Sequence, residues 1–235
     1  MSLSPAKLLA NRNNFWAVAR DGRLGWDDLL ALAAFIVPGC AIYGAVLAGW
    51  RSPVLSLYVA IKLPLLFLAT TAIVSVFNWM LASLLRAGLS FKATLLVVFA
   101  SMSITSWILL ALAPVSFFFM ISGAPAAGTD SELRYAHNFM LTTHILILAV
   151  AGVAGYAAML GGLRTMVNPG CPVGLLFVAW LGTSAFVGCQ MAWILRPFVG
   201  SPFYDVAFMR PDCLDRNFYE FVFGDVIPNL LRGGL

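Results

Sequence analysis

Five long apolar runs, separated by short polar turns, dominate the pattern of hydrophobic and polar positions along the chain. They cover about residues 29–48, 63–85, 93–121, 138–160 and 173–195. An α-helix of about 20 residues crosses the ~30 Å hydrocarbon core of a bilayer, so each run is long enough to span it. The pattern predicts an all-α fold, a polytopic helical membrane bundle of about five transmembrane helices over residues 29–195.

The start of the second span has two interpretations, because Lys62 and Pro64 stand within the apolar run that follows Pro53. Either residues 54–77 cross and Lys62 is buried, or residues 63–85 cross and Lys62 lies at the interface. A charged lysine at the centre of a bilayer costs about 3 kcal/mol or more. We favour the second register, with the ammonium snorkelling outward as an interface anchor.

The N-terminal segment, residues 1–28, is basic and amphipathic, with Leu8, Phe15 and Ala19 on one face of a helix predicted to start at Ser4-Pro5. It is either an interfacial helix on an anionic leaflet or an ordinary cytoplasmic lead-in. It has no apolar core and no small-residue cleavage site, so we do not expect a signal peptide.

The C-terminal tail, residues 196–235, is rich in aromatic residues. Within it, Asn217 followed by Glu220 matches a capping box, which predicts a helix limited by Pro228. Aromatic rings are favoured at the membrane interface, so we expect a re-entrant or surface helix there.

Composition agrees with the hydropathy pattern. Of the 235 residues, 61% are hydrophobic and 10% are charged, against roughly half and a quarter in soluble domains. Mean hydropathy is +0.92. The net charge of +4 is scattered along the chain, so nucleic acid is not an expected partner.

The distribution of Lys and Arg predicts the orientation. With the N-terminus inside, the outer loops contain only Arg51 and Arg134, and tail arginines well beyond the last span count for less. The expected topology is N-terminus cytoplasmic and C-terminus outside. The inner segments contain Lys7, Arg12, Arg20, Arg23, Arg86, Lys92 and Arg164.

Small residues recur at helical spacing on the last two spans and are the candidate helix-packing positions. Such stripes let two helix backbones approach closely within a membrane. We favour packing of the fourth span on the fifth, with an oligomerisation face as the alternative. The positions are Gly155 and Ala158 on the fourth span and Gly182, Ala185, Cys189 and Ala192 on the fifth.

Polar chemistry near the end of the fifth span is limited to Gln190, Trp193 and Arg196. Gln190 could donate a hydrogen bond to a neighbouring span, and Arg196 could meet a lipid phosphate or a tail carboxylate such as Asp205. We interpret these three residues as a polar clamp with an interface anchor rather than as a substrate site.

No metal, cofactor or catalytic residue is expected. The two histidines, His137 and His144, lie on one face of the fourth span without a carboxylate or thiolate nearby in sequence. We expect one at the interface and one bonded inside the bundle. The four cysteines form no CxxC pair, and the spans lack the acidic residues on which ion-coupled transport usually depends.

Several stretches resemble an uncharacterised group of bacterial five-span membrane proteins, loosely similar to the Yip family of eukaryotic trafficking proteins. They are residues 62–68, 113–115, 151–155, 193–202 and 217–220, of which Arg196-Pro197-Phe198 is the most distinctive. The resemblance implies five spans, a cytosolic N-terminus and a bacterial inner membrane. It implies no catalytic residues.

The preferred hypothesis is a non-enzymatic accessory, scaffold or membrane-organising subunit. Its expected partners are membrane lipids and other membrane subunits or a second copy of itself. One alternative is a small-solute channel or permease, which Pro38, Pro64, Pro114, Lys62 and Gln190 would serve. A further alternative is a redox accessory subunit that contacts quinone or pigment near His144 and Trp107.

Overall fold

The computed structural model describes residues 12–123 and 128–231, and within them the regular structure is helical. Five helices are long and apolar enough to cross a membrane, which confirms the predicted helical membrane bundle. They are α3 (Trp26–Gly49), α4 (Pro53–Leu84), α5 (Phe91–Gly123), α6 (Asp130–Met166) and α7 (Val173–Ile194). A short helix, α2 (Arg12–Arg20), precedes them.

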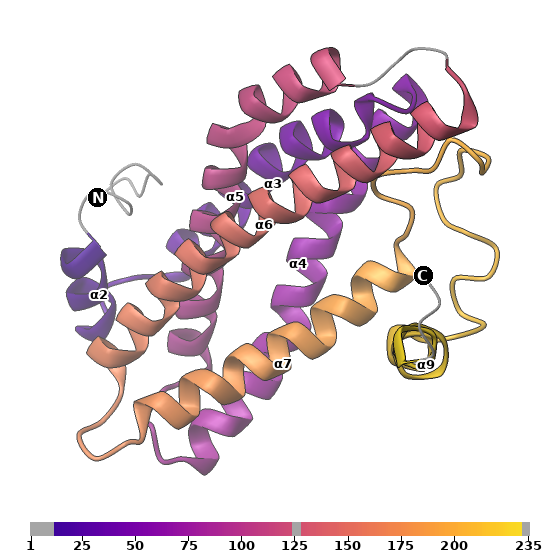
Figure 1. Cartoon of the computed structure of the whole chain (residues 1–235). Coiled ribbons are helices and arrows are strands. Elements are labelled where there is room, and N and C mark those ends of the chain that lie inside the picture. The colour runs from indigo at the N-terminus through magenta and orange to yellow at the C-terminus, as the bar shows by residue number, and fades with distance from the viewer. Residues whose placement is uncertain (1–11, 124–127, 232–235) are drawn as a thin grey trace.

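α5 is the central helix of the bundle. It packs along α3 on one side and along α6 on another, while α4 packs mainly on α3. α7 lies on the outside of α4 and touches α6 only slightly (Figure 1). Of the residues in its apolar stretch, 17% are buried, against 61% for α5. α7 is therefore the least enclosed span.

Local caps explain where the helices begin. Ser52 accepts a hydrogen bond from the Leu55 N–H at 3.0 Å, and Pro53 occupies the first turn of α4. α6 opens with a capping box between Thr129 and Glu132. α4 therefore starts ten residues before the span expected at residue 63, and Lys62 is inside it.

Glycines set the closest approaches between helices. A Cβ built on Gly44 of α3 would lie 2.6 Å from the Val59 carbonyl oxygen of α4. A Cβ on Gly39 would meet the Ser106 carbonyl oxygen of α5 at a similar 2.6 Å. The Ser106 hydroxyl donates to the Ile36 carbonyl at 2.8 Å. Helix α3 is thus held against both neighbours by backbone contact.

The apolar face of α2 is buried in the protein. Trp16 is 2% exposed and packs on Gly162 of α6, and Phe15 and Ala19 are buried beside it. The interfacial-helix interpretation assigned this face to lipid, which is wrong for Phe15 and Ala19. Leu8 and the expected start at Ser4-Pro5 lie outside the described residues.

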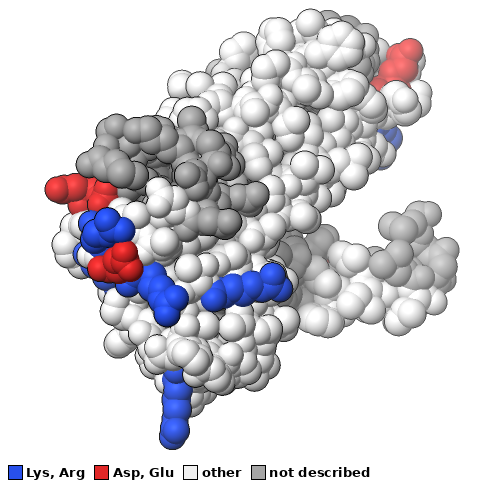
Figure 2. Space-filling view, turned by 90° about the vertical axis from the view of Figure 1, so that its left-hand side faces the viewer, with Lys and Arg blue, Asp and Glu red and all other residues white. Residues whose placement is uncertain are grey.

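Charged residues gather toward opposite ends of the bundle, with an uncharged surface between them (Figure 2). We call these the α2 end and the strap end. The strap end is the one that carries the α3–α4 turn and tail residues 195–217. At the α2 end, the turns after α4 and α6 are joined, because the Asn168 N–H donates to the Ala87 carbonyl at 2.9 Å. The uncharged band between the ends is the surface expected to face lipid.

Replacing Gly44 with alanine should destabilise the bundle. The new methyl group would overlap the Val59 carbonyl group, and overpacking of this kind costs about 1–3 kcal/mol. The free energy of unfolding, measured by denaturant titration in detergent, should fall by that amount. The control is Gly152→Ala in α6, where nothing lies within 4 Å of the new Cβ. Equal stabilities of the two variants would contradict the close approach.

Candidate functional site: the tail folded over one end of the bundle

The tail leaves α7, climbs to the turn between α3 and α4, and returns beside the C-terminal half of α7 (Figure 1). We call residues 195–217 the strap and residues 218–231 the arm. The strap has no helix. The arm comprises α8 (Phe218–Phe221), a π-helical turn over Val222–Val226, and α9 (Ile227–Leu231).

Side chains of the α3–α4 turn hold the strap by its main-chain carbonyls. The indole N–H of Trp50 donates to the Val199 carbonyl at 2.9 Å. The Arg51 guanidinium donates to the carbonyls of Ser201, at 3.0 Å, and Tyr204, at 3.3 Å. A strap without secondary structure needs such donors, because its carbonyls have no ladder or helix partner.

Lys62 lies directly beneath the strap. Its side chain is completely buried, and its Nζ donates to the Pro197 carbonyl at 3.0 Å. The rings of Phe198 and Phe208 lie 5.9 and 5.0 Å from Nζ, within cation–π range. Among the described residues, no carboxylate forms an ion pair with Lys62. The expected outward snorkelling is wrong, because the strap covers the ammonium.

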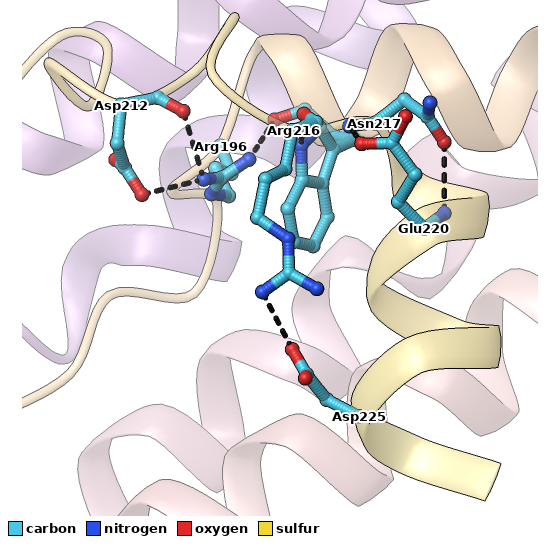
Figure 3. Close-up of polar contacts among 7 residues, drawn as sticks. Arg196, Asp212, Arg216, Asn217, Glu220 and Asp225 are labelled. Atoms are coloured by element: carbon cyan, nitrogen blue, oxygen red, sulfur yellow. Dashed lines mark hydrogen bonds and ion pairs between the residues drawn. The ribbon is translucent and has the colours of Figure 1, made fainter.

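Arg196 anchors the start of the strap. It forms an ion pair with Asp212 at 2.9 Å, and its guanidinium lies 3.7 Å from the centre of the Trp193 ring (Figure 3). A tail carboxylate was expected here, but Asp205 was the wrong choice. The strap bends back so that Asp212, 16 residues after Arg196, reaches the guanidinium.

The arm is fastened to α7 by polar contacts at its beginning. The indole of Trp193 donates to the Arg216 carbonyl at 2.6 Å, and Arg216 pairs with Asp225 at 2.8 Å (Figure 3). The Gln190 side-chain oxygen accepts from the Phe218 N–H at 3.0 Å. Gln190 therefore holds the arm, whereas sequence reasoning had it donate to another span.

The capping box predicted for the arm is confirmed. Asn217 accepts from the Glu220 N–H at 2.8 Å, and Glu220 accepts from the Asn217 N–H at 3.1 Å. The predicted limit at Pro228 is wrong, because α9 runs through it to Leu231.

The candidate packing residues fall into two groups. Gly155 and Ala158 are buried, and Gly155 packs against Ser101 and Thr105 of α5. On α7, Gly182 and Ala185 are exposed, while Cys189 and Ala192 are half-buried. The expected pairing of the fourth span with the fifth is wrong, because α6 packs on α5 and α7 on α4.

The histidines occupy different environments. His144 is 2% exposed, and its Nδ1 lies 2.8 Å from the Tyr43 hydroxyl of α3, so it is the histidine bonded inside the bundle. His137 is half-buried against Trp50, with ring centroids 5.9 Å apart. Neither lies in a group of three or more potential metal ligands within the described chain.

Sequence reasoning missed a set of buried polar groups on α4 and α7. Asn78 and Thr71 of α4 and Ser184 of α7 are at most 5% exposed. The side-chain polar atoms of Asn78 and Thr71 have no hydrogen-bond partner in the described structure, whereas the Ser184 hydroxyl lies beside that of Tyr156 of α6. Trp180 of α7 donates to the Asn78 carbonyl at 2.9 Å, which places the two helices in contact there. An asparagine in an apolar run was the signal that could have identified this seam.

No family model, curated protein or solved structure matches the chain. The resemblance to bacterial five-span proteins therefore stays a prediction.

Replacing Lys62 with methionine should release the strap without unfolding the bundle. A hydrogen bond from a charged donor contributes about 1.5–3 kcal/mol, and 1.4 kcal/mol is a factor of ten. Amide hydrogen exchange over residues 198–208 should therefore rise about tenfold or more. The melting temperature should stay constant or rise, because a buried ammonium is costly to desolvate.

The matched control is Lys92→Met, which removes a half-buried cation at the start of α5. Exchange in the strap should not change in this variant. If Lys62→Met also left strap exchange unchanged, the contact with Pro197 would not be what holds the strap.

Proposed function

We propose that the protein is a non-enzymatic accessory or scaffold subunit of the membrane, which binds a transmembrane helix of another subunit or of a second copy. The observation that carries this proposal is the outward position of the small residues on α7. Nothing lies within 4 Å of a Cβ built on Gly182, and Ala185 is exposed beside it.

The contrast with α6 supports this assignment. There, Gly155 and Gly162 face the protein, and each admits a neighbour to close range, Thr105 in one case and Trp16 in the other. Small residues also allow close packing between helices of different chains, since they let backbones approach where no hydrophobic force drives association. On α7, by contrast, a Cβ on Gly182 would meet no atom of the described residues within 4 Å.

The strap and arm support the same function by fixing one end of α7. Tyr219 of the arm donates to the Phe186 carbonyl at 2.7 Å, and the two rings stack at 4.7 Å. With Gln190 and Trp193 also bound, the C-terminal end of α7 is held rigidly. A rigid helix face loses less conformational entropy when a partner binds.

The proposed setting is a bacterial inner membrane with the N-terminus in the cytoplasm. Exposed arginines at the α2 end support this orientation, because cytoplasmic segments carry an excess of Lys and Arg. They are Arg20, Arg23, Arg86 and Arg164.

Leucine at position 182 should disrupt the association, because its side chain would hold a second helix away from the backbone of α7. After gentle detergent extraction, native mass determination should show a complex for the wild type. For Gly182→Leu it should show a several-fold lower fraction of complex.

The control is Gly152→Leu, at an equally open glycine on α6, which should leave the complex intact. Both variants should keep the wild-type melting temperature. A wild-type protein that is monomeric and free of partners under these conditions would remove the basis of the proposal.

A second candidate is a channel or permease for small polar solutes. The buried polar seam along α4 favours it, because the side chains of Asn78 and Thr71 have no hydrogen-bond partner among the described residues, and unpaired polar groups inside a span are costly unless they meet water or a solute. Lys62 lies farther toward the strap end of the same helix, α4.

Solute flux into proteoliposomes would test this candidate. Asn78→Leu should reduce flux severalfold, because it replaces the polar wall of the seam with an apolar one. Lys62→Ala tests separately whether the lysine contributes. Flux that is absent in the wild type, or equal in wild type and Asn78→Leu, would exclude transport along this seam.

A further inference from the structure

Two turns at the α2 end are joined and carry cations without acids. The Asn168 N–H, just after α6, donates to the Ala87 carbonyl, just after α4, at 2.9 Å, and the Asn168 side chain packs on Gly88. We call residues 85–92 and 164–172 the clasped turns. They contain no Asp or Glu, and their cations are Arg86, Lys92 and Arg164. The charge on this surface is therefore positive throughout.

These three cations are not neutralised within the described chain. None of them takes part in an ion pair with a described residue. Arg86 and Arg164 are exposed, and Lys92 is half-buried. The carboxylates of the same end lie between residues 21 and 28 instead, where Asp21 pairs with Arg23 at 2.9 Å. The clasped turns thus present unpaired positive charge to an anion from outside the chain.

Arg86 occupies a backbone position that favours glycine. α4 ends in a Schellman motif, in which the Ala87 N–H donates to the Ala82 carbonyl at 2.8 Å and the Arg86 N–H to the Ser83 carbonyl at 3.1 Å. Arg86 has a positive φ of 53°, a conformation that is strained for any residue with a Cβ. No ion pair within the described chain offsets this strain.

An exposed aromatic pair identifies the adjoining surface as one that faces lipid. Trp79 of α4 and Phe91 of α5 are exposed, and their rings lie 5.7 Å apart, edge to face. Trp79 comes two helical turns before Arg86, so the two residues lie on one side of α4, about 10 Å apart along its axis. Aromatic rings are favoured at the boundary between hydrocarbon and headgroups. A lipid whose acyl chain covers these rings would therefore have its headgroup at the clasped turns.

We propose that the clasped turns bind the phosphate of an anionic phospholipid, whose acyl chains lie against Trp79 and Phe91. Guanidinium groups match phosphate oxygens, and basic clusters at the ends of spans attract lipids of net negative charge. A zwitterionic lipid is disfavoured, because it brings its own ammonium to a surface that has no carboxylate. This inference does not depend on the function proposed above, because it uses none of the residues on the outward face of α7.

The test uses the full-length protein, delipidated in detergent and titrated by native mass spectrometry with two lipids of equal chain length. Phosphatidylglycerol should bind about tenfold more tightly than phosphatidylcholine, and this preference should shrink as the ammonium acetate concentration rises and screens the charges. Glycerophosphoglycerol, the same headgroup without chains, should bind far more weakly than the lipid, because it cannot contact Trp79 and Phe91.

Two variants of Arg86 separate lipid binding from stability. Arg86→Gln and Arg86→Gly should each weaken phosphatidylglycerol binding about fivefold or more, because each removes one cation from the phosphate. Arg86→Gly should also raise the melting temperature, because glycine adopts a positive φ without strain. The control is Arg23→Gln, which removes an exposed arginine of the same end that is already paired with Asp21, and it should change phosphatidylglycerol affinity less than about twofold.

Equal affinity for phosphatidylglycerol and phosphatidylcholine would overturn the proposal. So would an equal loss in Arg23→Gln and Arg86→Gln, since the preference would then follow the total charge of this end rather than the clasped turns. Glycerophosphoglycerol affinity equal to that of the lipid would overturn the assignment to a membrane lipid. Loss of the complex in Gly182→Leu has no bearing on these outcomes, so failure of one proposal is distinguishable from failure of the other.

Discussion

The strap end of this protein depends on one reciprocal constraint, the matching of side-chain donors with main-chain carbonyls. The strap has carbonyls without secondary-structure partners, and Arg51 of the α3–α4 turn and Lys62 of α4 form no ion pair among the described residues. Lys62 bonded to Pro197 and Arg51 bonded to Ser201 satisfy both needs at once. Without the strap, the Lys62 ammonium would have no hydrogen-bond acceptor from Pro197 although it lies within a membrane-spanning helix. Without these donors, irregular backbone would be unsatisfied close to the bilayer, which membrane proteins avoid.

The identity of the spans could be predicted from sequence because length and apolarity alone define them. Which helix packs on which could not, because these helices are apolar on all sides, so periodicity marks no buried face. Small residues indicated that close packing occurs at Gly155. They gave no sign that Gly182, with the same chemistry, faces outward. Only the three-dimensional arrangement distinguishes these two glycines.

Lys62 illustrates the same limit for polar groups. Burial of a charged lysine in hydrocarbon is costly, and the sequence argument assumed that only water at the interface could solvate the ammonium. The carbonyl that accepts its hydrogen bond lies 135 residues later in the chain. By contrast, the capping box at Asn217 was predictable, because both partners lie within four consecutive residues. Local hydrogen bonds can be deduced from spacing, and distant ones cannot.

The distance in sequence between Lys62 and Pro197 also sets an order of events during synthesis. At ~5–20 residues per second, a ribosome needs about 7–27 s to make the intervening 135 residues. During that interval α4 has been made but the carbonyl that accepts the Lys62 hydrogen bond has not. Until the strap has been made, Lys62 must therefore be solvated by water, by lipid headgroups or within the insertion machinery. Pro197 follows all five spans in the chain, so Lys62 of the second span meets its acceptor only after the fifth span has been made.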